Sequence, residues 1–420
     1  MKNILLLALK SLRNRKFTVC LTIVSIGLSV ALLLGVERIR TESRNSFTAT
    51  ISDIDLVVGA RSGPIQLLLY SVFRIGHATN NISWESYQDI AALPSVLWTI
   101  PISLGDSHRG YRVMGTSTEY FTRFSYGGKQ KLVFKKGAPF ADLYDAVLGA
   151  ETAQTLGYSI GDHIIISHGA GDVSFIEHAD KPFVVVGILA PTGTPVDQTI
   201  HVSLEGIEAI HVGWKGGSSV GGVKISADQA RRLKLTPKVI TAFLLKLQSP
   251  IATFTVQRTI NQYKEEPLTA ILPGVALQQL WELVGVAGKA LIVVSACVVV
   301  VGLFGMLTTL MTSLNERRRE MAILRSVGAR PVHIFSLIIG EAILVTVFGI
   351  ITGVVLLYSL LIIGQPLMVA RFGLYIHIAF FSGAELVLLG AVLLAGIVAG
   401  IIPGWKIYHY SLNDGMTIKT

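Results

Sequence analysis

Charged residues are scarce in this sequence. Only 15% of the 420 residues are Asp, Glu, Lys or Arg, whereas 51% are hydrophobic. Soluble globular domains carry about 25% charged residues, so this composition lies outside the range of an ordinary soluble protein. We therefore expect part of the chain to face lipid.

Cysteine is nearly absent. The two residues, Cys20 and Cys297, both lie inside apolar runs. This placement argues against a disulfide framework. We expect both cysteines to be small packing residues.

The sequence also lacks recognisable catalytic and nucleotide-binding motifs. Residues 285–290 (GVAGKA) come nearest to a phosphate-binding loop, but they lack its leading glycine spacing and a Ser or Thr after Lys289. Neither a GxSxG nucleophile elbow nor a convincing pair of catalytic acids is found. We therefore expect a non-catalytic chain without a cofactor of its own, and any energy input from a partner.

The net charge of +9 raises the question of nucleic-acid binding. The cations cluster beside the apolar runs and not along an aromatic-studded surface, which is the arrangement found at membrane flanks. We therefore expect the lipid bilayer, and not a nucleic acid, as the partner of these charges.

Four apolar runs are long enough to cross a bilayer as helices, for which about 20 residues are needed. They comprise residues 17–36, 290–314, 334–364 and 382–403. The first run is too long for a signal peptide, and no small-x-small cleavage site precedes Glu37. We interpret it as an uncleaved span.

Residues 37–288 have the texture of a folded water-soluble domain. No stretch in them is apolar for long enough to cross a membrane, and short β-rich runs alternate with Gly, Pro and Asp. The predicted fold class is an α-helical membrane protein with four transmembrane helices and a large α+β extracytoplasmic domain. This domain is inserted between the first two spans and has stalk helices at both ends.

Local signals predict several elements of this domain. The periodicity of residues 65–73 fits a helix and a strand equally. Ser83 and Ser203 are expected to cap the N-termini of helices. Helices are predicted over residues 83–93, 146–156 and 203–210.

The distribution of Lys and Arg predicts the orientation. Residues 1–16 form an amphipathic pattern with five of these cations, and residues 315–333 carry five more, whereas the loop of residues 365–381 has only Arg371. Positive charge stays on the cytoplasmic side of a membrane. We therefore expect both termini, including the tail of residues 404–420, in the cytoplasm and the large domain on the far side.

Residues 315–333 (NERRREMAILRSVGARPVH) also have the pattern of a short amphipathic helix. Gly328 can end this helix in a left-handed conformation, and Pro331 prevents its continuation. We interpret it as a cytoplasmic coupling helix that contacts a separate motor protein; a basic loop that only fixes the topology is the alternative. The predicted contact residues are Glu316, Arg317, Arg318, Arg319, Glu320, Leu324, Arg325 and Gly328.

Glycines four residues apart occur in the third run, at Gly349 and Gly353, and in the fourth, at Gly396 and Gly400. Small residues at this spacing let helices approach closely in lipid. We expect them to mediate helix packing more than a dimer seam.

The third run contains one acid, Glu341, about two turns from its cytoplasmic end. An ionised carboxylate at this depth is costly unless it is paired or hydrated. A proton or substrate relay is one interpretation. A hydrogen bond to a neighbouring helix or to the coupling segment is the favoured one, because a single acid is thin support for a relay.

Histidines are comparatively frequent in residues 37–288. His163, His168 and His178 are candidate ligands for a borderline metal such as zinc. Their spacing matches no established motif such as HExxH. Ordinary surface histidine is therefore the favoured interpretation at each position.

The layout resembles the FtsX/MacB-like family of ABC transporter permeases, the mechanotransmitting type VII, in the group without a fused ATPase. The segment ERRREMAILRSVGARPVHI is similar to the coupling helix of that family. The segments LGYSIGDHIIIS, PFVVVGIL and TIHVSLEGIEAI resemble its periplasmic core domain.

The resemblance implies a multi-pass protein of the bacterial inner membrane with a periplasmic domain. It also implies a second permease copy, most simply a homodimer, and two copies of a cytoplasmic ATPase that bind ATP and Mg²⁺. Mechanical motion would act on lipoprotein, peptide or small-molecule cargo, with a periplasmic adaptor, carrier or lipoprotein as a further partner. The cargo, the direction of transport and the periplasmic binding surface are left open.

Two alternatives stay open. The segment DLVVGARSGPIQLLLYSVFRIG resembles a narrower subgroup, and this resemblance implies a part in a zinc-handling ABC system. An ATPase-driven regulator of periplasmic cell-wall enzymes is the other. An ion channel or secondary transporter is disfavoured, because the four spans carry only two acids.

Overall fold

The computed structural model of the protein describes residues 15–168, 176–177, 180–212, 214–215, 218–219, 226–316, 323, 326–372 and 380–408. The chain divides into two compact units. We name them the helical unit (Met1–Ser43, Val284–Leu367 and Ile376–Thr420) and the sheet unit (Arg44–Leu283 and Met368–Tyr375). The predicted N-terminal amphipathic helix, residues 1–16, lies almost entirely outside the described residues.

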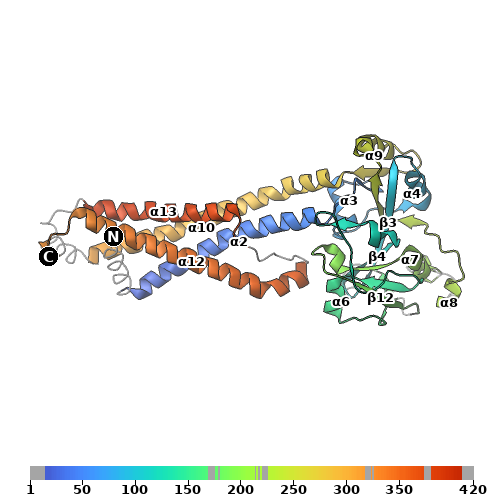
Figure 1. Ribbon diagram of the computed structural model, residues 1–420, viewed down its shortest axis with the longest axis horizontal. Coiled ribbons are helices and arrows are strands. Elements are labelled where there is room, and N and C mark those ends of the chain that lie inside the picture. Colours follow the sequence, from blue (N-terminus) through green and yellow to red (C-terminus); the bar gives the residue numbers. More distant parts are fainter. Residues whose placement is uncertain are drawn as a thin grey trace. The chain divides into compact units, whose positions relative to one another are not determined.

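Four helices in the described part of the chain are long and apolar enough to cross a membrane. Figure 1 labels them α2 (Lys16–Ala49), α10 (Pro273–Glu316), α12 (Pro331–Phe372) and α13 (Gly383–Tyr408). The sheet unit lies between the first two of them in the sequence. This arrangement confirms the predicted fold class.

The first two long helices extend beyond the predicted apolar runs. α2 continues past residue 36 to Ala49, and α10 begins at Pro273 and not at residue 290. Hydropathy detects only the apolar part of a helix, so the polar continuations that the sequence predicted as stalks carry no such signal.

The third long helix also differs at both ends from the predicted run. It begins at Pro331, so the coupling segment ends before residue 331; proline suits a first helical turn because its φ is already helical and its missing N–H is not needed there. At the other end the helix continues to Phe372, into the predicted loop of residues 365–381.

Both cysteines lie on exposed helix faces. Cys20 is exposed on α2 and Cys297 on α10. The expectation that they fill space between helices is therefore wrong. In a span that faces lipid, an apolar side chain needs no protein neighbour, so an apolar sequence context does not identify a packing residue.

The sheet unit is built around a 12-stranded sheet, nine strands of which follow one path. Most neighbours are antiparallel, whereas β13 pairs parallel with β4 and β12 pairs parallel with β8. In spatial order the path is β18 (Leu268–Ile271), β1 (Leu56–Ala60), β17 (Ala242–Leu247), β3 (Val96–His108), β4 (Tyr111–Thr116), β13 (Thr199–Ser203), β8 (Asp145–Leu148), β12 (Phe183–Leu189) and β7 (Phe134–Gly137).

Shorter strands complete the unit. Off the main path are β9 (His163–Ile164), β10 (Ser167–His168) and β11 (Ile176–Glu177). Three two-stranded sheets consist of β2 (Ile82–Ser83) with β16 (Val239–Ile240), β5 (Ser125–Tyr126) with β6 (Gln130–Lys131), and β14 (Trp214–Lys215) with β15 (Ser218–Ser219).

Short helices connect these strands. They are α3 (Pro64–Ser71), α4 (Trp84–Ala91), α5 (Glu119–Arg123), α6 (Ala150–Leu156), α7 (Leu204–His211), α8 (Ala227–Ala230) and α9 (Thr253–Asn261), with 3₁₀ turns η1 (Pro195–Gln198) and η2 (Pro250–Ala252). Several of them are labelled in Figure 1.

Strand β1 shows how the core is divided between the two faces of the sheet. All five of its residues are buried. Val57 belongs to the same apolar cluster as Leu67 of α3, whereas Val58 packs in a cluster with Val256 and Ile260 of α9. Because successive strand residues point to opposite faces, helices must cover both sides of this strand.

Of the local predictions for the sheet unit, some are confirmed and one is partly wrong. The N-caps are confirmed, because Ser83 Oγ accepts a hydrogen bond from the Ser86 N–H and Ser203 Oγ accepts one from the Gly206 N–H. The ambiguous residues 65–73 form most of helix α3. The helix predicted over residues 146–156 is partly wrong, since its first residues belong to β8.

Candidate functional site: contacts between the membrane helices

The predicted glycine pair of the third span lies against the first span. A Cβ atom at Gly349 would lie 2.5 Å from Cγ2 of Ile26, and one at Gly353 would lie 2.7 Å from the carbonyl oxygen of Gly27. Neither position has room for a larger side chain without movement of a helix. These two glycines therefore set the close approach of α12 to α2.

The glycines of the fourth span lie against the third. A Cβ atom at Gly396 would lie 2.3 Å from Oγ1 of Thr346, and one at Gly400 would lie 2.6 Å from Cβ of Ala342. α12 therefore has close neighbours on two sides, α2 and α13. The glycine spacing in the sequence fits contacts inside one chain.

A buried ion pair joins the first span to the fourth. Arg38 donates from Nε to Glu385 Oε1 at 2.9 Å and from Nη2 to Oε2 at 3.1 Å. The two side chains are only 5% and 3% exposed. The ring of Tyr358 in α12 lies 5.2 Å from the guanidinium carbon, so three helices meet at this pair. A bidentate, desolvated pair of this kind fixes both distance and orientation.

Glu385 also caps the helix that carries it. Its Oε2 accepts a hydrogen bond from the Ser382 N–H at 2.8 Å, and its own N–H donates to Ser382 Oγ at 3.2 Å. This reciprocal arrangement is a capping box, and its negative charge suits a helix N-terminus. The Glu385 carboxylate therefore caps the N-terminus of α13 and also forms the ion pair with Arg38 of α2.

Sequence reasoning missed this site. It assigned no role to Arg38 or to Glu385. The spacing Ser382 to Glu385 before an apolar run was a usable signal for the capping box. Nothing in the sequence pairs Arg38 with a residue more than 300 positions away.

Glu341 is buried, with 4% of its surface exposed. It lines a small cavity together with Arg15 and Thr22 of the first span region and Thr309 and Ser313 of α10. Arg15 Nη2 donates to the Ser313 carbonyl at 3.2 Å. Polar neighbours lower the cost of a carboxylate in an apolar span, which favours a contact between helices over a proton relay.

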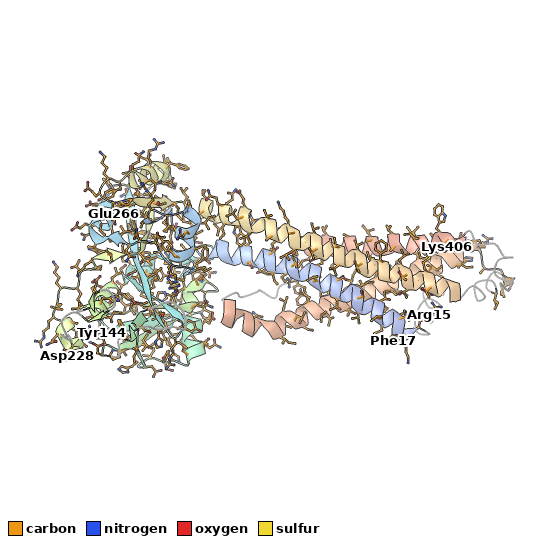
Figure 2. The ribbon with its side chains drawn as sticks, turned by 180° about the vertical axis from the view of Figure 1, so that it is seen from behind. Arg15, Phe17, Tyr144, Asp228, Glu266 and Lys406 are labelled. Atoms are coloured by element: carbon orange, nitrogen blue, oxygen red, sulfur yellow. The ribbon has the colours of Figure 1, made fainter. Side chains whose placement is uncertain are left out.

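The start of α2 and the end of α13 lie at the same end of the helical unit. Figure 2 shows Arg15 and Phe17, at the start of α2, at the same end of the unit as Lys406, near the end of α13. The Glu341 cavity, which Arg15 lines, therefore lies toward this end.

Most of the predicted coupling helix lies outside the described residues. This applies to Arg317, Arg318, Arg319, Glu320, Leu324 and Arg325, while Glu316 is the last residue of α10. Gly328 is described and has a φ of +102°. The Val327 N–H donates to the Ile323 carbonyl at 3.1 Å, so helical geometry precedes the left-handed glycine, as the pattern predicts.

The structure does not test the three candidate metal ligands as one site. His163 is exposed on β9 and lies opposite Val184 of β12. His168 lies on β10, which pairs with β3 and β11, and His178 is outside the described residues. Among the described residues there is no group of three His, Cys, Asp or Glu side chains that could hold a metal ion.

His201, by contrast, is not a surface histidine. It is fully buried on β13 and packs against the rings of Tyr120 and Phe121, at centroid distances of 5.3 and 5.8 Å. Burial, with a smaller contribution from the charge of Arg74, lowers the pKa of His201 to about 3. The imidazole is therefore neutral at physiological pH.

Two family models match the chain. The model described as "MacB-like periplasmic core domain" matches residues 19–263, which is more than half of the chain. The model described as "FtsX-like permease C-terminal" matches residues 292–412. The second match begins within α10, and residues 264–291 lie between the two matches.

Curated relatives match over most of the chain at low identity. The pyoverdine export ATP-binding/permease protein PvdT of Pseudomonas fluorescens (strain Pf0-1) is 23% identical over 77% of this chain and 46% of the relative. The macrolide export ATP-binding/permease protein MacB of Azoarcus sp. (strain BH72) is 24% identical over 83% of this chain and 50% of the relative. The chain therefore spans about half the length of these relatives.

A solved structure, the periplasmic region of MacB from Actinobacillus actinomycetemcomitans, is also similar. It is 10% identical, covers 55% of this chain and 94% of its own length, and has a TM-score of 0.33.

Proposed function

Because the chain belongs to the FtsX/MacB-like family of ABC transporter permeases, we propose that it is a membrane subunit driven by a separate cytoplasmic ATPase. In this proposal the ATPase contacts residues 315–330, which we name the basic segment. ATP binding and hydrolysis then move the periplasmic domain. The chain itself performs no chemistry, and ATP and Mg²⁺ bind to the partner.

The observation that carries this proposal is the extent of helix α10. One uninterrupted helix runs from Pro273, next to the last strand of the sheet unit, to Glu316 at the start of the basic segment. Helix α2 likewise runs without a break from Lys16 to Ala49. Displacement of the basic segment would therefore be transmitted along a continuous backbone and not across a flexible linker.

The names of the relatives support ATP as the energy source and export as the activity. Their names include "ATP-binding/permease" and export of pyoverdine or macrolide. We further propose that the chain acts as a dimer, most simply of two identical copies, on lipoprotein, peptide or small-molecule cargo in the periplasm. An adaptor, carrier or lipoprotein would be its periplasmic partner.

The test is affinity purification of the full chain from gently solubilised membranes, with mass spectrometry and an ATP hydrolysis assay. We expect a stoichiometric ATPase to co-purify with the wild type. Charge reversals at the basic segment, Arg319→Glu and Glu320→Arg, should abolish this association while membrane insertion stays normal.

A matched control is Arg123→Glu, which reverses an exposed charge on the sheet unit and should leave the association intact. Unchanged ATPase recovery with both coupling variants would refute the proposed contact. The identity of the co-purifying periplasmic protein separates export, lipoprotein, cell-wall and metal-handling functions.

A further inference from the structure

The main path of the sheet has two edge strands, and the first of them, β18, is covered. Helix α9 lies along this edge: Gln257 Nε2 donates to the Ala270 carbonyl at 3.0 Å, and the Ala270 N–H donates to Asn261 Oδ1 at 2.7 Å. Three of the four residues of β18 are buried. Side chains of α9 thus occupy the backbone groups with which another strand would pair.

The opposite edge strand, β7, is open. In the described part of the chain, β12 is the only strand that pairs with it. Figure 1 labels β12, its neighbour, and α9, which covers the other edge, on opposite sides of the sheet unit. Lys135, Lys136 and Gly137 of β7 are exposed. The outer side of such a strand offers N–H and C=O groups to another extended chain.

The extended backbone at this edge is longer than β7 itself. The Ala190 N–H donates to the Val133 carbonyl at 2.8 Å, and the Ala138 N–H donates to the Val186 carbonyl at 3.2 Å. Pairing with β12 therefore holds residues 133–138 in place. We name residues 133–138 the open edge. Its length is close to that of an ordinary strand, which has about 5–6 residues.

Cations surround the open edge. Residues 120–141 contain no Asp or Glu, and their cations are Arg123, Lys129, Lys131, Lys135 and Lys136. All five are exposed. Lys129 and Lys131 belong to the hairpin of β5 and β6, which directly precedes the open edge in the sequence. A positive surface of this kind attracts acidic partners and speeds their association.

Lysines on an edge strand commonly serve only to keep other strands away. This role explains Lys135 and Lys136, but not the exposed apolar side chains at both ends of the open edge. Val133 is 59% exposed and Ile160 is 46% exposed. A Cβ atom at Gly137 would lie 2.9 Å from Cδ1 of Ile160, which places that side chain at the far end. Apolar contacts at both ends favour binding over repulsion alone.

We propose that the open edge binds an extended acidic segment of a partner polypeptide, which adds to β7 as a further strand. Backbone hydrogen bonds supply affinity, and the lysines select a segment that carries carboxylates. A lipid headgroup can use the charges but not the backbone groups. The inference rests on the proposed function for the existence of a periplasmic partner, to which it assigns a chemistry and a binding surface.

The experiment uses the full chain in an uncharged detergent and a fluorescein-labelled peptide of about eight residues that alternates Val and Glu. Backbone pairing and charge require no particular sequence, so a generic peptide is a valid probe. We expect saturable binding by fluorescence polarisation. The double variant Lys135→Glu with Lys136→Glu should bind at least about tenfold more weakly, whereas the matched reversal of two exposed cations elsewhere in the unit, Arg232→Glu with Lys234→Glu, should keep wild-type affinity.

A second peptide separates strand addition from attraction between charges. It has the same side chains, but alternate backbone nitrogens are methylated, which removes hydrogen-bond donors and keeps the charge. We expect at least about tenfold weaker binding of this peptide to the wild type. A photoreactive benzoylphenylalanine placed in the unmethylated peptide should crosslink to the open edge, as mapped by mass spectrometry.

Three results would each overturn the proposal. They are no saturable binding to the wild type, equal binding of the methylated peptide, as a surface for anionic lipid predicts, and wild-type affinity in the Lys135→Glu, Lys136→Glu variant. Circular dichroism confirms that each variant is folded. Recovery of the ATPase with this variant should equal that of the wild type, so failure here is distinguishable from failure of the proposed ATPase contact.

Discussion

Arg38 and Glu385 show what a single pair can contribute in an apolar span. Each group is nearly excluded from solvent and forms two hydrogen bonds to the other. Removal of one partner leaves the other charge buried without compensation, which typically costs about 3–5 kcal/mol. The value of the pair is thus visible mainly when it is broken.

We therefore predict that Arg38→Gln and Glu385→Gln each lower the thermal unfolding temperature of the detergent-solubilised protein. The double variant should be less destabilised than the sum of the two, because no unpaired charge is left. Circular dichroism at 222 nm, which is dominated by the long helices, is the measurement.

The control for this prediction is Arg40→Gln. Arg40 pairs with Glu37 but is 45% exposed, and exposed pairs contribute at most about 1 kcal/mol. Equal melting temperatures for Arg38→Gln and Arg40→Gln would contradict the role assigned to the buried pair.

His201 predicts acid sensitivity of the sheet unit. Its folded pKa of about 3 lies below the ordinary value of 6.5, so the unfolded state binds the proton more readily. The stability that this neutral imidazole contributes is complete above pH 6.5 and is lost as the pH falls toward 3. At pH 4 the loss from this group is up to about 3 kcal/mol.

The measurement is thermal unfolding followed by tryptophan fluorescence at pH 7 and pH 4. Four of the five tryptophans belong to the sheet unit, namely Trp84, Trp98, Trp214 and Trp281. His201→Phe should show a smaller loss of melting temperature on acidification than the wild type, and the exposed His163→Gln should match the wild type. The same acid-induced loss in all three proteins would exclude His201 as the cause.

At the scale of elements, α12 packs closely against two of the other spans. It meets α2 at Gly349 and Gly353, and α13 at Thr346 and Ala342. Its other glycines, Gly340 and Gly364, face open space. One helix thus offers both sensitive and insensitive positions for the same substitution.

We predict that Gly353→Ala destabilises the helical unit by about 1–3 kcal/mol, because the new methyl group meets a backbone carbonyl that cannot move alone. Gly340→Ala should be neutral or stabilise by up to about 1 kcal/mol, since alanine is the better helix former. Helix melting by circular dichroism compares the two. A lower melting temperature for Gly340→Ala than for Gly353→Ala would contradict the proposed α2 contact.

The sequence predicted elements best where one signal acted alone. Long apolar runs identified four spans, and serine caps located the helices after Ser83 and Ser203. It failed where tertiary contacts decide: Ala146 to Leu148 form a strand because β12 and β13 pair with them on both sides. Within the candidate site, the glycine spacing could be recognised in the sequence. The Arg38–Glu385 pair could be found only once the fold was known.

At the scale of the molecule, the predicted orientation is testable with single cysteines. Lys135 is exposed on the sheet unit, and Ser326 is exposed in the basic segment. If positive charge marks the cytoplasmic side, a membrane-impermeant maleimide should label Lys135→Cys in spheroplasts. It should label Ser326→Cys only after lysis.

The native thiols Cys20 and Cys297 lie in apolar spans, which a membrane-impermeant reagent does not enter, so the wild type should give little background. Labelling of Ser326→Cys in intact spheroplasts would reverse the proposed topology.

The length of α10 has a mechanical consequence. Its 44 residues make a rod of about 66 Å at 1.5 Å per residue, against a hydrocarbon core of about 30 Å. In the proposed mechanism such a rod would act as a lever: a rotation of about 10° about one end would carry the other through about 11–12 Å. A change of angle of this size at one end of α10 would therefore become, at its other end, a displacement about as wide as a helix.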